Sequence, residues 1–151
     1  MRAFVFAALI LFSAFAYPSS VAAQSFDYRA LQADPTVDRV AKIMAQVALE
    51  GRGDHHFVLS YCSTAPGVVL PPDVRTQHPV EITIVLEWQY DDLVVSEHEI
   101  RVTVSFNSQP ARIVIPLAAL TSFSDPSVGL QVWLRSGATS EARCTGIGDI
   151  I

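Results

Sequence analysis

The chain has 151 residues, of which 50% are apolar and 17% are charged, and it carries a net charge of −5. This length and composition suit one domain with a real hydrophobic core and exclude a collagen-like or disordered protein. The negative charge argues against non-specific binding to nucleic acid and against docking on anionic lipid, because both need a cationic surface.

The first 23 residues have the three parts of a secretory signal peptide and account for the high mean hydropathy of +0.34. Arg2 supplies the positive end, residues 3–17 are almost entirely apolar, and small residues at 21–23 precede the expected cleavage before Gln24. Because the apolar run is shorter than a membrane-spanning helix needs, we expect a cleaved leader and an exported, periplasmic protein. The alternative is an uncleaved leader that tethers the domain to the membrane.

The first element expected in the mature chain, after an arm at 24–33, is an amphipathic helix over about residues 35–50. Asp34 suits the N-cap and Pro35 the first helical position, while Gly51 is expected to end the helix. Apolar residues recur at helical spacing at Val37, Val40, Ala41, Met44, Val47 and Ala48. This stripe must be buried, either on the rest of the domain or on a second copy of the same helix.

From residue 56 onward the apolar pattern changes to the alternation of β-strands. Strands are predicted at 56–61, 81–88, 93–95, 99–106, 111–115, 122–123 and 130–134. The segment 62–79 is predicted to be a Pro- and Gly-rich loop, 116–120 is expected to hold a single helical turn, and 135–151 is expected to be an irregular, loosely ordered tail.

These elements predict one domain over residues 24–134, with its β part at about 55–134. Serial short strands with a single helix are typical of a mainly β fold with an N-terminal α-helix. We therefore expect a small, strongly curved β-sheet or open barrel. Such a sheet has edges and grooves that can accept an extended peptide through backbone hydrogen bonds.

Cys62 and Cys144 are the two cysteines of the chain. In an oxidising compartment such a pair can form a disulfide, which would close a loop of about 80 residues and stabilise by about 4 kcal/mol in the chain-entropy model. The sequence leaves open whether their Cα atoms come within reach of each other.

Candidate catalytic and metal-binding groups are few. Asp54, His55 and His56 could form a metal site or a hydrolase centre, but adjacent histidines on a strand point to opposite faces and cannot share one ion. The sequence contains no nucleophile, phosphate-binding or dinucleotide motif. We therefore expect no enzymatic activity, no metal and no cofactor.

Several short motifs follow one another in an order typical of one family. They are Gly53–Phe57, Ala65–Val68, Glu81–Leu86, Asp92–Leu93, Val104–Asn107, Pro110, Ile115–Leu120 and Phe123–Gly129. This ordered set resembles the stringent starvation protein B (SspB) family in its alphaproteobacterial form, over about residues 26–134. The resemblance implies an Sm-like β domain and a homodimer formed through the N-terminal helix, whose stripe is Val37, Val40, Ala41, Met44, Val47 and Ala48.

The resemblance also implies a non-enzymatic adaptor for proteolysis. SspB proteins bind ssrA-type degradation tags in a hydrophobic groove and deliver the tagged substrates to the ClpXP protease. The stretches that resemble the walls of this peptide-binding groove are Thr83, Ile84, Val85 and Leu86, and Val104, Ser105, Phe106 and Asn107.

Two features depart from the family pattern. Family members work in the cytoplasm, whereas this chain begins with an export signal. They also end in a flexible tail with a ClpX-docking segment, which residues 144–151 do not resemble. The alternative interpretation is an exported SspB-like β domain that has lost ClpX delivery and acts as a structural or binding module. The sequence does not name the peptide ligand or establish that ClpX binds.

Overall fold

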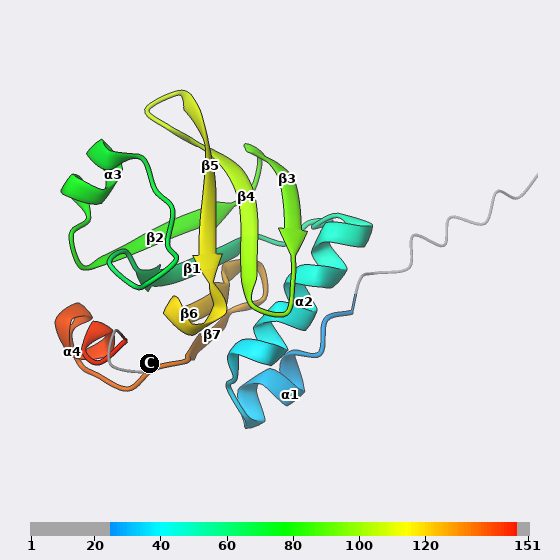
Figure 1. The fold of residues 1–151 in the computed structure, drawn as a ribbon. Helices are drawn as coiled ribbons and strands as arrows, with labels where there is room; N and C mark the ends of the chain where they lie inside the picture. Colours follow the sequence, from blue (N-terminus) through cyan, green and yellow to red (C-terminus); the bar gives the residue numbers. More distant parts are fainter. Residues whose placement is uncertain (1–24, 148–151) are drawn as a thin grey trace, which may run out of the picture.

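Two antiparallel sheets form the centre of the computed structural model, which describes residues 25–147. Their strands are β1 (Phe57–Cys62), β2 (Glu81–Leu86), β3 (Tyr90–Val95), β4 (Glu99–Phe106), β5 (Gln109–Pro116), β6 (Leu120–Asp125) and β7 (Leu130–Trp133). The strand order is β2-β1-β6-β7 in one sheet and β3-β4-β5 in the other. Figure 1 shows the upright strands of the second sheet crossing those of the first.

The helices lie around these sheets (Figure 1). They are α1 (Tyr28–Ala33), α2 (Val37–Glu50), α3 (Pro72–Gln77) and α4 (Ser140–Cys144), with short 3₁₀ turns η1 (Leu117–Ala119) and η2 (Pro126–Val128). The predicted mainly β fold with an N-terminal helix is confirmed, and across residues 25–147 the two sheets do not close into a barrel. No helix in this range is both long and apolar enough to cross a bilayer. The predicted signal peptide at 1–23 lies outside the described residues.

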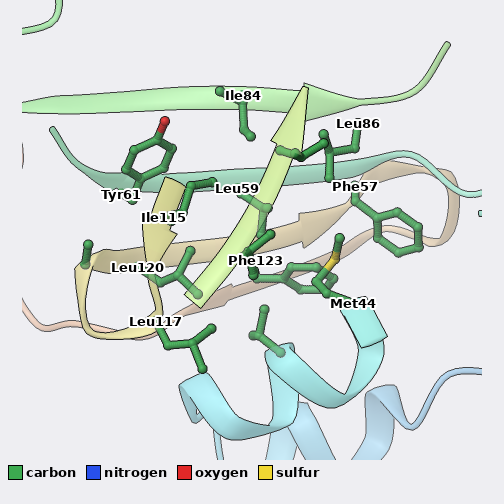
Figure 2. Packing of buried hydrophobic residues seen from close by; sticks show 14 of the residues in the cluster. Met44, Phe57, Leu59, Tyr61, Ile84, Leu86, Ile115, Leu117, Leu120 and Phe123 are labelled. Carbon is green, nitrogen blue, oxygen red and sulfur yellow. The ribbon is translucent and has the colours of Figure 1, made fainter. Parts of the chain in front are cut away.

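Strands β2, β4 and β7 bury alternate side chains, as their sequences predict, whereas β1 and β6 are buried at nearly every position. In β2, Ile82, Ile84 and Leu86 point inward, while Thr83 and Val85 are exposed. The largest buried side chains come from β1 and β6, where Phe57 and Phe123 stack with their ring centroids 5.9 Å apart. Figure 2 shows these rings between the sheets and α2. One continuous core therefore joins both sheets and the helix.

The apolar stripe of α2 is buried on the chain's own sheets. Val40, Met44 and Val47 are almost completely buried, together with Ile43, which the predicted stripe omitted, and Figure 2 shows Met44 reaching from α2 toward the sheet. In this structure the chain's own core therefore buries these three members of the predicted dimer stripe, which is the first of the two partners that the sequence left open for the stripe.

The other members of the stripe are partly or fully open. Val37 and Ala41 are half-buried, and Ala48 is exposed. Ala41 also lines a shallow hollow between α2 and the end of β3. A homodimer through this open part of α2 stays a prediction.

Helix α2 begins two residues after the predicted start. Thr36 is its N-cap, and the side-chain oxygen of Thr36 accepts a hydrogen bond from the Arg39 N–H at 3.4 Å. Asp34 instead ends α1, a helix that the sequence pattern did not reveal, and donates its backbone N–H to the Ala30 carbonyl. Gly51, with a φ of +83°, ends α2 as expected.

The C-terminal segment corrects the expectation of an irregular tail. Residues 140–144 form α4, whose N-cap Thr139 accepts a hydrogen bond from the Ala142 N–H at 3.2 Å. A disulfide joins Cys144 to Cys62 at the end of β1, where the two Cα atoms lie 5.5 Å apart. A short helix with no apolar period is ordered by these tertiary contacts, which the local sequence does not encode.

Candidate functional site

A cavity of about 400 Å³ lies between the end of β2 and the end of β4. The residues that line it come from both strands and from the turn after β2: Thr83, Ile84, Val85, Glu87, Trp88, Gln89, Val104, Ser105 and Phe106. The two stretches singled out from the sequence, 83–85 and 104–106, thus meet across one cavity although they are far apart along the chain. Sites for small or extended ligands are typically concave and partly apolar in this way.

Two residues of the expected groove do not line this cavity. Leu86 is fully buried, and Figure 2 shows its side chain among the core residues. Asn107 lies in the turn between β4 and β5 with a φ of +49°, next to a separate hollow near α3. Leu86 lies on the inward face of β2 with Ile82 and Ile84, opposite the exposed Thr83 and Val85.

The sequence pattern missed the turn residues Glu87, Trp88 and Gln89. The predicted strand ran to Trp88, which placed that side chain on the same face as Leu86. Strand β2 instead ends at Leu86, and Trp88 is 77% exposed. Residues 87–89 connect β2 to β3, which begins at Tyr90.

Polar contacts hold this turn against the segment that joins α2 to β1. The indole Nε1 of Trp88 donates a hydrogen bond to Glu87 Oε1 at 2.6 Å, and His56 Nδ1 lies 3.5 Å from the same oxygen. The guanidinium of Arg52 lies 4.4 Å from the centre of the Trp88 ring. Burial raises the pKa of nearby Tyr90, and the positive charge of Arg52 opposes that rise.

Strand β2 also offers backbone groups to a ligand. It is an edge strand, and in the described part of the chain its only strand partner is β1. The side of its backbone that faces away from β1 is therefore not paired within a sheet. An edge of this kind can accept an extended peptide as an additional strand.

The sequence cluster of Asp54, His55 and His56 does not form one site. His55 Nδ1 lies 2.6 Å from a carboxylate oxygen of Asp125, whereas His56 faces Glu87. Within residues 25–147 no three His, Cys, Asp or Glu side chains gather closely enough to hold a metal ion. The two histidines diverge because they are neighbours on an extended chain.

Asp125 is the centre of a buried polar network at the end of β6. One of its oxygens accepts hydrogen bonds from His55 and, at 2.5 Å, from the Tyr28 hydroxyl. The other accepts hydrogen bonds from the hydroxyl and backbone N–H of Ser127 and, at 3.4 Å, from the backbone N–H of His56. This network ties α1, the start of β1 and η2 together.

The environment of Asp125 favours its ionised form. Burial by itself raises the pKa of a carboxyl, but the hydrogen bonds from Ser127, Tyr28, His55 and His56 outweigh burial and lower the pKa of Asp125 below its ordinary value. Burial, followed by the hydrogen bond to Asp125, raises the pKa of Tyr28, so its O–H remains a donor. These hydrogen bonds therefore stabilise the packing of the elements that they join.

One family model matches most of the chain. The model of SspB, stringent starvation protein B, matches residues 35–145, a range that contains α2, both sheets and every residue that lines the cavity. A search of curated proteins gave no match. SspB proteins are non-catalytic adaptors, so membership supports an adaptor-like role without enzymatic activity. The chain therefore belongs to the stringent starvation protein B family.

Proposed function

We propose that the protein is a peptide-binding adaptor that holds an extended peptide of the ssrA-tag type in the cavity between β2 and β4. One observation carries this proposal. The stretches 83–85 and 104–106, which resemble the groove walls of the SspB family, line the same cavity. The cavity also adjoins the turn at 87–89, which adds polar side chains to its rim.

Strand addition at β2 is the mode of binding that this geometry supports. Val85 is 52% exposed and presents an apolar surface, while Thr83 and Ser105 supply hydroxyl groups. In this mode the unpaired backbone of the edge strand provides affinity, and pockets for alternate peptide side chains provide specificity.

The proposal is tested by titrating a fluorescently labelled ssrA-type peptide with the purified protein and with two matched variants. Val85→Glu places a charge in the cavity, and Val94→Glu places the same charge on β3 at a valine that is 51% exposed and outside the cavity. We expect Val85→Glu to weaken binding at least tenfold and Val94→Glu to leave it unchanged. Failure of the folded, unsubstituted protein to bind at high micromolar concentrations would overturn the proposal.

A second candidate function is an exported peptide-binding module that does not deliver to ClpXP. The disulfide between Cys62 and Cys144 favours it, because such bonds persist in oxidising compartments. The disulfide also fastens the segment that follows β7 to β1, in a family whose delivery function uses a free tail. We propose that residues 1–23 direct this export.

An assay of ClpXP degradation separates the two functions. A delivering adaptor accelerates degradation of a substrate that carries an ssrA-type tag. A module that only binds leaves the rate unchanged or slows it by covering the tag. The same reaction with the Val85→Glu variant shows whether any effect depends on the cavity.

A further inference from the structure

We propose that the bond between Cys62 and Cys144 is a site of thiol–disulfide exchange, at which a dithiol reductant releases residues 135–147 from the rest of the domain. These residues are called the C-terminal segment below. The exchange gives the domain two states, one with the segment fastened to the sheet and one with the segment free. This inference goes beyond the proposed function and does not depend on peptide binding.

The C-terminal segment is attached to the sheet at few points. Within residues 25–147, the side-chain hydrogen bonds that leave the segment end on Glu81: Arg143 donates two at 3.0 and 2.9 Å, and the Ser140 hydroxyl donates one at 3.5 Å. The guanidinium of Arg143 also lies 4.6 Å from the centre of the Trp133 ring. Apart from these contacts, the disulfide is the main fastening of α4.

The segment adds little to the hydrophobic core. The fully buried apolar residues of the described chain end at Val132, and within the segment Cys144 and Ile147 pack against the core while only partly buried. Other hydrogen bonds of the segment are internal, such as the one from Arg135 Nε to the Arg143 carbonyl at 2.6 Å. The segment can therefore move away while the two sheets and α2 keep their core.

The disulfide decides whether the segment stays in place. Ordering a stretch of chain costs conformational entropy at every residue, and a helix as short as α4 is not stable by itself. The contacts with Glu81 offset only part of this cost. The disulfide removes many of the alternative conformations, because it keeps the Cα atoms of Cys62 and Cys144 5.5 Å apart. Breaking the bond should therefore favour the free state.

The two sulfur atoms differ in their access to a reductant. Cys62 is 1% exposed, whereas Cys144 is partly buried and lies at the end of α4, a helix at the outside of the molecule in Figure 1. An incoming thiolate therefore attacks Cys144. As the new S–S bond to Cys144 Sγ forms, the bond to Cys62 breaks, and Cys62 leaves as a thiolate that takes up a proton.

A second thiol of the same reductant completes the exchange. It attacks the reductant sulfur of the mixed disulfide and displaces Cys144, which also takes up a proton. The two cysteines have then gained two electrons and two protons, and the reductant has become a disulfide. Dithiols of this kind are carried by redox proteins and by small molecules such as dithiothreitol, which serves as the probe below.

The test is amide hydrogen exchange of the purified protein, followed by NMR with and without dithiothreitol. In the fastened state the amides of Ala142 and Arg143 are hydrogen-bonded to Thr139. We expect their exchange to accelerate at least about tenfold on reduction, while exchange in β4 and β5 stays unchanged. Removal of dithiothreitol and addition of oxidised glutathione should restore slow exchange.

Two variants separate the disulfide from the ion pair. Cys62→Ser/Cys144→Ser should exchange rapidly at residues 142–143 with or without dithiothreitol. Glu81→Gln weakens the contact with Arg143 but retains the disulfide, so its exchange at these residues should remain slow until the reductant is added. The reduced native protein carries the test even where the serine variant does not fold.

Three outcomes would overturn the proposal. The first is unchanged exchange at residues 142–143 in the fully reduced protein. The second is acceleration that extends equally to β4 and β5, because the bond would then hold the whole fold. The third is a disulfide that dithiothreitol reduces only in denaturant. None of these measurements uses a peptide, so each of them leaves the proposed function standing.

Discussion

Arg143 of α4 and Glu81, the first residue of β2, form a paired ionic contact. Arg143 Nε donates to Glu81 Oε2 at 3.0 Å, and Nη2 donates to Oε1 at 2.9 Å. The two side chains are only 9% and 12% exposed. Together with the disulfide from Cys144 to Cys62, this contact fastens α4 to one end of the strand whose other end lines the cavity.

Replacement of Arg143 should destabilise the protein. Arg143→Ala leaves the carboxylate of Glu81 mostly buried without its partner, so we expect the free energy of unfolding to fall by about 2 kcal/mol in urea denaturation. The control is Arg112→Ala, which removes an exposed contact with Asp92 at 3.7 Å and should change stability by less than about 0.5 kcal/mol. Equal losses of unfolding free energy in the two variants would contradict the claim that burial makes the contact between Arg143 and Glu81 important for stability.

Removal of the disulfide should lower the free energy of unfolding more than Arg143→Ala does. Cys62 and Cys144 are separated by 82 positions, and opening a loop of this size lowers the free energy of unfolding by about 4 kcal/mol in the chain-entropy model. Urea unfolding of the native protein and of the Cys62→Ser/Cys144→Ser variant measures this difference. A reductant should destabilise the native protein and have no effect on the variant. Two free thiols in the protein isolated from its compartment, detected by alkylation and intact mass, would contradict the bond.

The free energy of unfolding should depend on pH because of the ionisation of Asp125. Because its pKa is lower in the folded protein than the ordinary value of 3.8, folding favours the ionised carboxylate. The resulting stabilisation is complete above that ordinary value and is lost as the pH falls through the lowered pKa. Asp125→Asn should therefore lower the free energy of unfolding by about 2 kcal/mol at neutral pH and by much less near pH 2.

The exposed Asp54 provides the control for this titration. Asp54→Asn removes a carboxylate two residues before His56 without touching the buried network, so its stability should follow that of the unsubstituted protein across the pH range. A constant gap between Asp125→Asn and the unsubstituted protein from pH 7 to pH 2 would show that ionisation of Asp125 does not contribute.

The proposed export makes a simple prediction about the N-terminus. Cleavage of the leader gives a mature protein whose first residue is Gln24, which N-terminal sequencing of the native protein detects. A native protein that retains Met1 and sediments with membranes would support the tethered alternative.

Strands β2 and β4 could be predicted from the sequence because burial alternates along them with a period of two. Alternation of Ile100, Val102 and Val104 located β4 with its correct ends, and the helical spacing of Val40, Met44 and Val47 located α2. The spacing of these apolar residues in α2 did not reveal which surface buries them. That surface is the chain's own core, a property of the tertiary structure rather than of the helix.

The rest of the site depended on contacts that local pattern does not encode. The apolar alternation of β2 continues through Trp88 in the sequence, so the sequence pattern predicted Trp88 on the same face as Leu86. In the structure the strand ends at Leu86, and this prediction is wrong. Helix α4 has no apolar period, and its order comes from Cys62 and Glu81, which are distant in sequence. The resemblance to the family located the two groove stretches, whereas the turn between β2 and β3 required the structure.

The central claim is that an extended peptide occupies the cavity between β2 and β4. The most direct measurement is amide chemical-shift mapping of the isotope-labelled protein during titration with an unlabelled ssrA-type peptide. The account predicts saturable shifts concentrated at residues 83–89 and 104–106, with little change in α4 or in the network around Asp125. Saturable shifts confined to other surfaces, or no shifts at millimolar peptide, would contradict it.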